Sequence, residues 1–161
     1  MVGDGSYLML SQEIVTSIQE RAKLTVVLVD NDGFASIGGL SRDKGTRGFG
    51  TRYQYRVDGS LGDDSAHDGG KRLPVDLALN AEGLGAHVFR ARNVEELRDA
   101  LLAAKKIERT VVIHVPVDRY EGVPSYASWW EVPVAEVAES GDVERARHEH
   151  EKGLARRRWY L

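Results

Sequence analysis

The hydrophobic and polar residues of this chain follow a helical period in some segments and a strand-like pattern in others. Apolar side chains recur about every four positions over residues 8–22, which predicts an amphipathic helix. A short β-branched run at 24–30 follows, and such a run is typical of a strand buried on both faces. The two patterns return as helices at 73–85 and 93–106 and as strands at 86–91 and 110–116. This alternation predicts an α/β fold in which helices cover both faces of a parallel sheet.

Two segments depart from this alternation. Residues 31–70 carry ten of the 17 glycines and have no sustained period, so we expect a long functional loop there. After the last predicted strand the chain continues as an extension that contains tryptophans and ends in a charged segment, predicted to be helical over 142–158. We therefore divide the chain into a main domain at 1–132 and a charged helical tail at 133–161.

The composition excludes several classes of function. The 161 residues carry a net charge of −3, which gives no general attraction to nucleic acid or to an acidic membrane. There is no cysteine, so disulfides and thiolate chemistry are excluded. No apolar run approaches the roughly 18 residues of a membrane helix, and the first residues lack the pattern of a signal peptide. These features predict a cytoplasmic protein that binds neither nucleic acid nor membrane.

The chain begins with a glycine turn that contains a carboxylate. Gly3 and Gly5 flank Asp4 just before the first predicted helix, and Ser6 follows. Glycines in such a turn let the backbone approach a phosphate, but a carboxylate would repel the phosphate unless a cation lay between them. The dinucleotide fingerprint fails because Leu8 stands where its third glycine is required. There is no room for a full strand before the turn, so we expect that the N-terminal part of the domain is missing.

A second polar segment follows the next predicted strand. Asn31 and Gly33 lie in the run "DNDGF", one helix and one parallel strand after Asp4, so both segments fall at the carboxyl edge of the sheet. A carboxylate, an amide oxygen and a glycine carbonyl are hard oxygen ligands of the kind that Mg²⁺ shares with phosphates. The residues therefore predict a Mg²⁺ ion that holds a diphosphate against the amides of Gly5 and Ser6.

The motifs "GDGS" and "NDG", at this spacing, resemble the diphosphate-binding motif of thiamine-diphosphate enzymes. The resemblance implies the fold of their C-terminal domain, with thiamine diphosphate and Mg²⁺ as cofactors. It implies metal ligands at Asp4, Asn31 and the carbonyl of Gly33. That family usually has asparagine where this chain has Asp30. The implied cofactor-binding residues are Gly3, Asp4, Gly5, Ser6, Asn31, Gly33 and Phe34, and catalytic residues stay unassigned.

Three further runs, "GFASIGGLS", "GFGTRY" and "YASWWEVPVAEV", resemble one branch of this family, the trihydroxycyclohexane-1,2-dione hydrolases of myo-inositol breakdown. The resemblance implies the C-terminal part of a longer, homo-oligomeric hydrolase. It also implies cleavage of a C–C bond of a polyhydroxylated cyclic 1,2-diketone, with 5-deoxy-glucuronate as product. Ile37 stands where yeast-type pyruvate decarboxylases carry a catalytic glutamate. In this family a glutamate of another domain contacts the cofactor's aminopyrimidine, so we expect the chain alone to be inactive.

A different class of protein stays open as an alternative. The run "VVLVDND" also resembles the first strand of a response-regulator receiver domain, a signalling module that would bind Mg²⁺ at Asp30 and Asp32. A receiver has a helix directly after these acids. This chain instead has the glycine-rich segment, which argues against the receiver interpretation.

Four other residues have both a structural and a functional interpretation. His114 lies in a predicted strand, and we interpret it as a core or strand-end residue rather than a catalytic one. His67 lies in the glycine-rich segment and is a weaker candidate for substrate contact. Trp129 and Trp130 are interpreted as packing or subunit-contact anchors.

Overall fold

The computed structural model describes residues 1–56, 71–121 and 133–157. Contacts within the chain divide it into two compact units. One comprises Met1–Phe34 and Leu73–Tyr120, and the other comprises Ala35–Arg72 and Glu121–Leu161. The first unit contains both sequence motifs, so it is the unit that positions the candidate site. The boundary predicted at residue 132 lies outside the described residues and stays a prediction.

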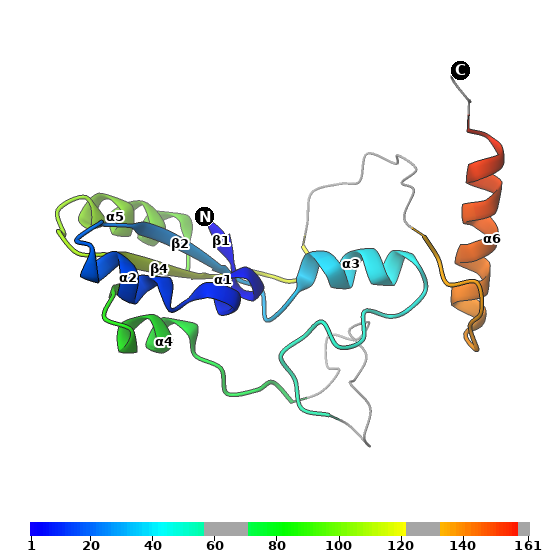
Figure 1. Cartoon of the computed structure of the whole chain (residues 1–161), viewed down its shortest axis with the longest axis horizontal. Helices are drawn as coiled ribbons and strands as arrows, with labels where there is room; N and C mark the ends of the chain where they lie inside the picture. The colour runs from blue at the N-terminus through cyan, green and yellow to red at the C-terminus, as the bar shows by residue number, and fades with distance from the viewer. Residues whose placement is uncertain (57–70, 122–132, 158–161) are drawn as a thin grey trace. The chain divides into compact units, whose positions relative to one another are not determined.

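The first unit is built on a parallel sheet that, in the described part of the chain, has four strands in the order β1-β2-β4-β3 (Figure 1). The strands are β1 Val2–Gly3, β2 Thr25–Asp30, β3 His87–Arg90 and β4 Val111–Pro116. β1 has only two residues, and it pairs with β2 through Val2 opposite Leu28 and Gly3 opposite Val29. This short strand places the glycine turn beside the end of β2.

Helices cover both faces of the sheet, which confirms the predicted fold class (Figure 1). The helices of this unit are α1 Asp4–Leu10, α2 Glu13–Gln19, α4 Leu77–Gly83 and α5 Val94–Ala104. The consecutive β4 residues Val111, Val112 and Ile113 are fully buried, because they alternate between the two faces and each face has its own core. One core contains Tyr7, Ile14, Leu28, Leu77, Ala81, Ala86 and Val112, and the other contains Ala91, Ala100, Ala104, Val111 and Ile113.

The single helix predicted at 8–22 is in fact two helices, and the first begins earlier than predicted. α1 begins at Asp4, and a turn at Ser11 and Gln12 separates it from α2. Both turn residues keep near-helical backbone angles, with φ −60° and ψ −28° at Ser11 and φ −63° and ψ −17° at Gln12. The apolar period therefore continues through the turn, and the hydrophobic pattern could not reveal the break.

The helix starts show which sequence signals were correct. Asn93 caps α5 as predicted, because its Oδ1 accepts the N–H of Glu96 at 2.8 Å. α4 begins after Asp76, whose Oδ1 accepts the N–H of Leu79 at 2.8 Å. The helix start predicted at residue 73 was therefore too early.

The second unit contains α3 Ala35–Asp43 and α6 Gly141–Ala155 among its described residues. α3 corrects the expectation that 31–70 form a loop without regular structure, and its Gly38 and Gly39 explain why no helical period was visible. α6 agrees closely with the helix predicted at 142–158. The loop after α3 packs tightly in this unit, since a Cβ at Gly45 would lie 2.5 Å from the backbone of Asp142. Gly45 also has φ +83°, so a larger residue would be strained there.

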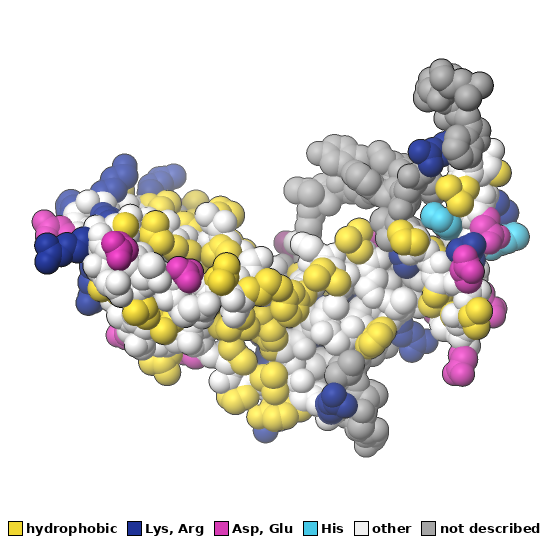
Figure 2. All heavy atoms as spheres, viewed as in Figure 1, with side chains coloured by type: hydrophobic (Ala, Val, Ile, Leu, Met, Phe, Trp, Pro, Cys, Tyr) yellow, Lys and Arg dark blue, Asp and Glu magenta, His cyan; other side chains and the backbone are white. Residues whose placement is uncertain are grey.

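Hydrophobic side chains are exposed on the surface of the sheet unit (Figure 2). They include Met9 on α1 at 67% exposed, Leu79 on α4 at 60% and Val94 on α5 at 66%. Exposed apolar surface of this kind is typical of regions that contact other protein. No helix in the described ranges is long and apolar enough to cross a bilayer.

Candidate functional site

The two sequence motifs meet at the carboxyl edge of the neighbouring strands β1 and β2. Asp4 is the first residue of α1, directly after β1, and Asn31 is the first residue after β2. The N–H of Gly33 donates a hydrogen bond of 2.6 Å to Asp4 Oδ2. The structure therefore brings together the three residues that the sequence predicted as metal ligands.

Asp4 carries a carboxylate that is almost completely removed from water, since the residue is only 1% exposed. Its Oδ2 accepts the N–H of Gly33, and its Oδ1 accepts the N–H of Gly5 at 2.9 Å. Burial raises the pKa of Asp4 above its usual value, and the nearby Asp30 carboxylate adds to the rise, while the two backbone N–H groups oppose it. The charged form of Asp4 is therefore incompletely compensated by the protein.

The amide of Asn31 brings another oxygen to the same place. The side-chain oxygen of Asn31 faces only hydrogen-bond acceptors. Its position lies 2.9 Å from the Gly33 carbonyl oxygen and 3.3 Å from Asp4 Oδ1. If the amide turned over, its NH₂ group would stand there and donate to both oxygens. In that orientation the Asn31 amide bridges the Gly33 carbonyl oxygen and the Asp4 carboxylate.

The spacing of these oxygens fits Mg²⁺. An octahedral Mg²⁺ with ligands at about 2.0–2.1 Å places neighbouring oxygens about 2.8–3.0 Å apart. The separation of 2.9 Å between the Asn31 amide and the Gly33 oxygen equals such an edge and is also the ordinary length of an N–H···O hydrogen bond, and 3.3 Å to Asp4 Oδ1 is longer. No group of three histidine, cysteine, aspartate or glutamate side chains that could hold a metal exists among the residues that the structure describes. A Mg²⁺ site here would therefore depend on amide and carbonyl oxygens beside a single carboxylate.

The other predicted cofactor-binding residues surround this oxygen cluster. A Cβ at Gly3 would meet nothing within 4 Å, so the first glycine leaves open space. A Cβ at Gly5 would lie 2.6 Å from two ring carbons of Phe34, so the second glycine makes room for that ring. Ser6 is exposed at the start of α1. Because the N–H of Gly5 already donates to Asp4, the exposed Ser6 is the better placed of the two to meet a diphosphate.

The turn that carries Asn31 has a specific backbone shape. Asp30 Oδ1 accepts the N–H of Asp32 at 3.1 Å, which closes a turn around Asn31. Asp32 has φ 67° and Gly33 has φ 135°, both in the positive region that side chains rarely adopt. These angles direct the Gly33 carbonyl toward the Asn31 amide and the Gly33 N–H toward Asp4.

Two basic side chains from the β4 region contact this turn. His114 Nε2 lies 2.8 Å from Asp30 Oδ2, and this hydrogen bond is the main cause that lowers the pKa of Asp30. His114 thus fits the predicted role of a partnered strand residue. Arg119 Nη1 donates to the Asn31 carbonyl oxygen at 3.1 Å. Sequence reasoning missed Arg119, whose only signal was a basic residue just beyond a strand end.

The receiver interpretation is not supported, although α3 begins soon after the acids as a receiver would require. The two carboxylate oxygens of Asp30 are engaged separately, one by His114 and one by the backbone of Asp32. The oxygen cluster instead forms around Asp4 and Asn31.

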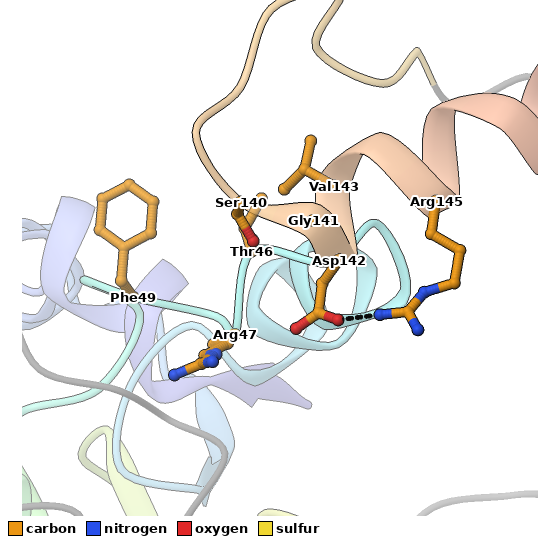
Figure 3. A pocket seen from close by; sticks show the side chains of 9 residues that line it. Thr46, Arg47, Phe49, Ser140, Gly141, Asp142, Val143 and Arg145 are labelled. Atoms are coloured by element: carbon orange, nitrogen blue, oxygen red, sulfur yellow. Dashed lines mark hydrogen bonds and ion pairs between the residues drawn. The ribbon is translucent and has the colours of Figure 1, made fainter.

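A cavity of about 970 Å³ lies elsewhere, within the second unit (Figure 3). It is lined by the loop after α3, including Arg47 and Phe49, and by the first turn of α6. Asp142 stands in that turn and pairs with Arg145, so the carboxylate offsets the positive charge in the cavity. None of the predicted site residues lines this cavity, and its chemistry does not indicate a specific ligand.

Some residues considered from the sequence lie outside the described residues. They are His67, Trp129 and Trp130. Their proposed roles therefore stay predictions.

Comparisons with known proteins show which proteins this chain resembles. A family model described as "Thiamine pyrophosphate enzyme, C-terminal TPP binding domain" matches residues 1–115. The chain is 39% identical over 160 residues to a 3D-(3,5/4)-trihydroxycyclohexane-1,2-dione hydrolase of Clostridium botulinum (strain Eklund 17B / Type B), in an alignment that covers 99% of this chain and 24% of that protein. A second such hydrolase, from Bacillus cereus, is also 39% identical with the same coverage. The chain spans about a quarter of the length of these relatives.

Solved structures share the fold. The match with benzoylformate decarboxylase from Polynucleobacter necessarius covers 73% of this chain and 19% of the decarboxylase chain, with a TM-score of 0.55 and 23% identity. The thiamine diphosphate-dependent 4-hydroxybenzoylformate decarboxylase of Rhodococcus jostii RHA1 matches the same shares with a TM-score of 0.53 and 18% identity. At these identities the likeness concerns the fold alone.

The contact between Gly5 and Phe34 predicts a coupling in stability. In the wild-type chain, Gly5→Ala must displace the Phe34 ring, which offsets the helix-propensity gain of up to about 1 kcal/mol. In a Phe34→Ala background the new methyl group fits, so the gain should appear. We expect the two effects on the free energy of unfolding in urea to differ by about 1–3 kcal/mol. Gly3→Ala is the control and should have the same effect in both backgrounds, whereas equal effects of Gly5→Ala would contradict the contact.

Proposed function

The chain belongs to the thiamine pyrophosphate enzyme family, as a C-terminal TPP binding domain, and from this premise we propose that its oxygen cluster binds Mg²⁺ and the diphosphate of thiamine diphosphate. Asp4 Oδ1, Asn31 Oδ1 and the Gly33 carbonyl oxygen would be the protein ligands. The diphosphate would complete the coordination of the cation, as Mg²⁺ prefers.

One observation carries this proposal, namely that the Asn31 amide lies 2.9 Å from the Gly33 carbonyl oxygen and 3.3 Å from Asp4 Oδ1, so that the three groups converge on one place. The buried Asp4 strengthens it, because burial already disfavours its charge and a bound cation would reverse that effect. The same arrangement explains the aspartate between two glycines. Without the cation, Asp4 would repel a diphosphate, whereas with it Asp4 helps to bind one.

The protein groups in this site bind and orient rather than react. When bound, thiamine diphosphate supplies a stabilised carbanion for C–C bond cleavage, and the protein supplies position and electrostatics. The open space beside Gly3 and the exposed Ser6 at the start of α1 would let the diphosphate approach the backbone. Phe34, packed against Gly5, would fix the chain just after the Gly33 ligand.

We further propose the reaction of the whole enzyme from its named relatives. They are hydrolases of 3D-(3,5/4)-trihydroxycyclohexane-1,2-dione, so the substrate would be this polyhydroxylated cyclic diketone of inositol breakdown. This chain would contribute the metal and diphosphate half of the site. The rest of the relatives' length would supply the groups that contact the aminopyrimidine and the substrate, within a homo-oligomer.

Removing the charge of Asp4 tests the metal site. Asp4→Asn, titrated with Mg²⁺ in the presence of thiamine diphosphate by calorimetry, should raise the Kd of Mg²⁺ more than about 100-fold, beyond the 10–100-fold typical of residues outside the ligand shell. Asn31→Ala should also weaken binding. The metal-free Asp4→Asn chain should be less stable in urea than the wild type, because an asparagine cannot accept the buried N–H groups of both Gly5 and Gly33.

Asp99→Asn is the matched control, since Asp99 is exposed on α5 and lies outside the oxygen cluster. It should bind Mg²⁺ and thiamine diphosphate as the wild type does. Unchanged affinity in both Asp4→Asn and Asn31→Ala would overturn the assignment of the ligands.

The division of the site predicts how activity is distributed. Residues 1–161 with Mg²⁺, thiamine diphosphate and the trihydroxycyclohexanedione should not consume the diketone. Addition of the part of the Clostridium botulinum relative that this chain does not span should restore turnover, and the Asp4→Asn chain should fail to do so. Turnover by the chain alone at about 1 per second or faster, a rate typical of enzymes, would refute the half-site proposal.

A further inference from the structure

We propose that the β4 region holds the metal turn in position through two basic side chains, His114 and Arg119, which act as positioning residues for the ligands Asn31 and Gly33. The inference rests on the proposed function, because it concerns the turn that would supply two of the three metal ligands. His114 would act through Asp30, which it contacts, and Arg119 would act through the Asn31 backbone, which it contacts.

His114 fixes the first residue of the turn. Its Nε2 lies 2.8 Å from Asp30 Oδ2, and both side chains are largely buried, at 13% and 20% exposed. The other oxygen of Asp30 accepts the N–H of Asp32. A single carboxylate therefore connects a β4 side chain to the backbone on the far side of Asn31.

Arg119 holds the same turn from a second point. Its Nη1 donates to the Asn31 carbonyl oxygen at 3.1 Å. The N–H of Val117 also donates to the Asp30 carbonyl oxygen at 2.8 Å, which continues the β2–β4 pairing to the start of the turn. β4 and the residues just after it therefore hold the turn. His114 and the Val117 N–H contact Asp30, and Arg119 contacts the Asn31 backbone.

The support matters because the backbone shape of the turn decides where its ligands point. The positive φ values of 67° at Asp32 and 135° at Gly33 must be kept if the Gly33 carbonyl is to face the Asn31 amide. β4 is a rigid support, since its Val111, Val112 and Ile113 are fully buried. Metal ligands must be held close to their productive positions, and this requires that the residues supporting them are fixed by packing and hydrogen bonds.

The residue at position 30 agrees with this role. This chain has an aspartate at position 30, and its Oδ2 lies 2.8 Å from His114 Nε2. A carboxylate can accept from His114 with one oxygen and from Asp32 with the other. An asparagine would have one acceptor oxygen and one donor NH₂ group, so it could not accept both bonds in this geometry.

The test compares two replacements of His114 in residues 1–161. His114→Leu removes the hydrogen bond, whereas His114→Gln keeps a side-chain N–H group that can donate to Asp30. Calorimetric titration with Mg²⁺ in the presence of thiamine diphosphate should give a Kd about 10–100-fold higher for His114→Leu. His114→Gln should recover most of that loss, and His87→Gln, the same change at the first residue of β3, should bind as the wild type does.

Two further variants separate positioning from general stability. In an Asp30→Asn background, His114→Leu should weaken Mg²⁺ binding by less than it does in the wild type, because its partner is already changed. Arg119→Leu should raise the Kd of Mg²⁺. It should lower the free energy of unfolding of the metal-free chain by less than a core substitution would. Rescue by glutamine and this non-additivity are not expected of a residue that only stabilises the fold.

The outcomes are distinguishable from those of the metal-site test. If the wild type binds Mg²⁺ and thiamine diphosphate but His114→Leu and Arg119→Leu bind them equally well, this inference is wrong and the proposed function stands. If the wild type does not bind them, the proposed function fails and the positioning role fails with it. Weaker binding in both leucine variants, with rescue by His114→Gln, supports the inference.

Discussion

The candidate site depends on one electrostatic constraint, which is the burial of the Asp4 carboxylate next to the Asn31 amide and the Gly33 carbonyl group. Asp4 is 1% exposed and is held by two backbone N–H groups, yet its pKa is raised because burial outweighs them. The Asn31 amide and the Gly33 carbonyl oxygen lie beside it, and the amide lies 3.3 Å from Asp4 Oδ1 and 2.9 Å from the Gly33 oxygen. A divalent cation would satisfy all three oxygens at once and would convert a site that repels phosphate into one that binds it. The metal and the diphosphate would therefore depend on each other for binding.

The sheet places these oxygens together with few residues. Parallel pairing of β1 with β2 sets the end of one strand beside the end of the other, so Asp4 and Asn31 meet although 27 positions separate them, from 4 to 31. The glycines serve different purposes within this arrangement. Gly3 leaves space open, Gly5 admits the Phe34 ring, and Gly33 adopts a backbone angle that turns its carbonyl into the site. Substituting any one of them would therefore affect a different part of the site.

The sequence predicted much of the fold and the meeting of Asp4, Asn31 and Gly33 at one edge of the sheet. The features that it did not predict were hidden for physical reasons. Buried β-branched runs revealed the strands, and the chemical types at two strand ends revealed Asp4, Asn31 and Gly33. The break between α1 and α2 was hidden because the turn keeps near-helical angles, and α3 was hidden by its glycines. Contacts of His114 and Arg119 with the turn depend on β4 lying next to β2. The order of strands in a sheet is set by packing across the whole unit, and the local pattern of residues does not contain it.

The central claim is that the three oxygens of Asp4, Asn31 and Gly33 ligate a divalent cation that also holds the diphosphate. The most direct measurement is a crystal structure of the chain grown with Mn²⁺ and thiamine diphosphate, with the metal located by its anomalous scattering. We predict one metal at about 2.1 Å from Asp4 Oδ1, Asn31 Oδ1 and the Gly33 carbonyl oxygen, with diphosphate oxygens completing its shell. A metal bound instead between Asp30 and Asp32, or a diphosphate bound with the Asn31 NH₂ group turned toward Gly33, would contradict the claim.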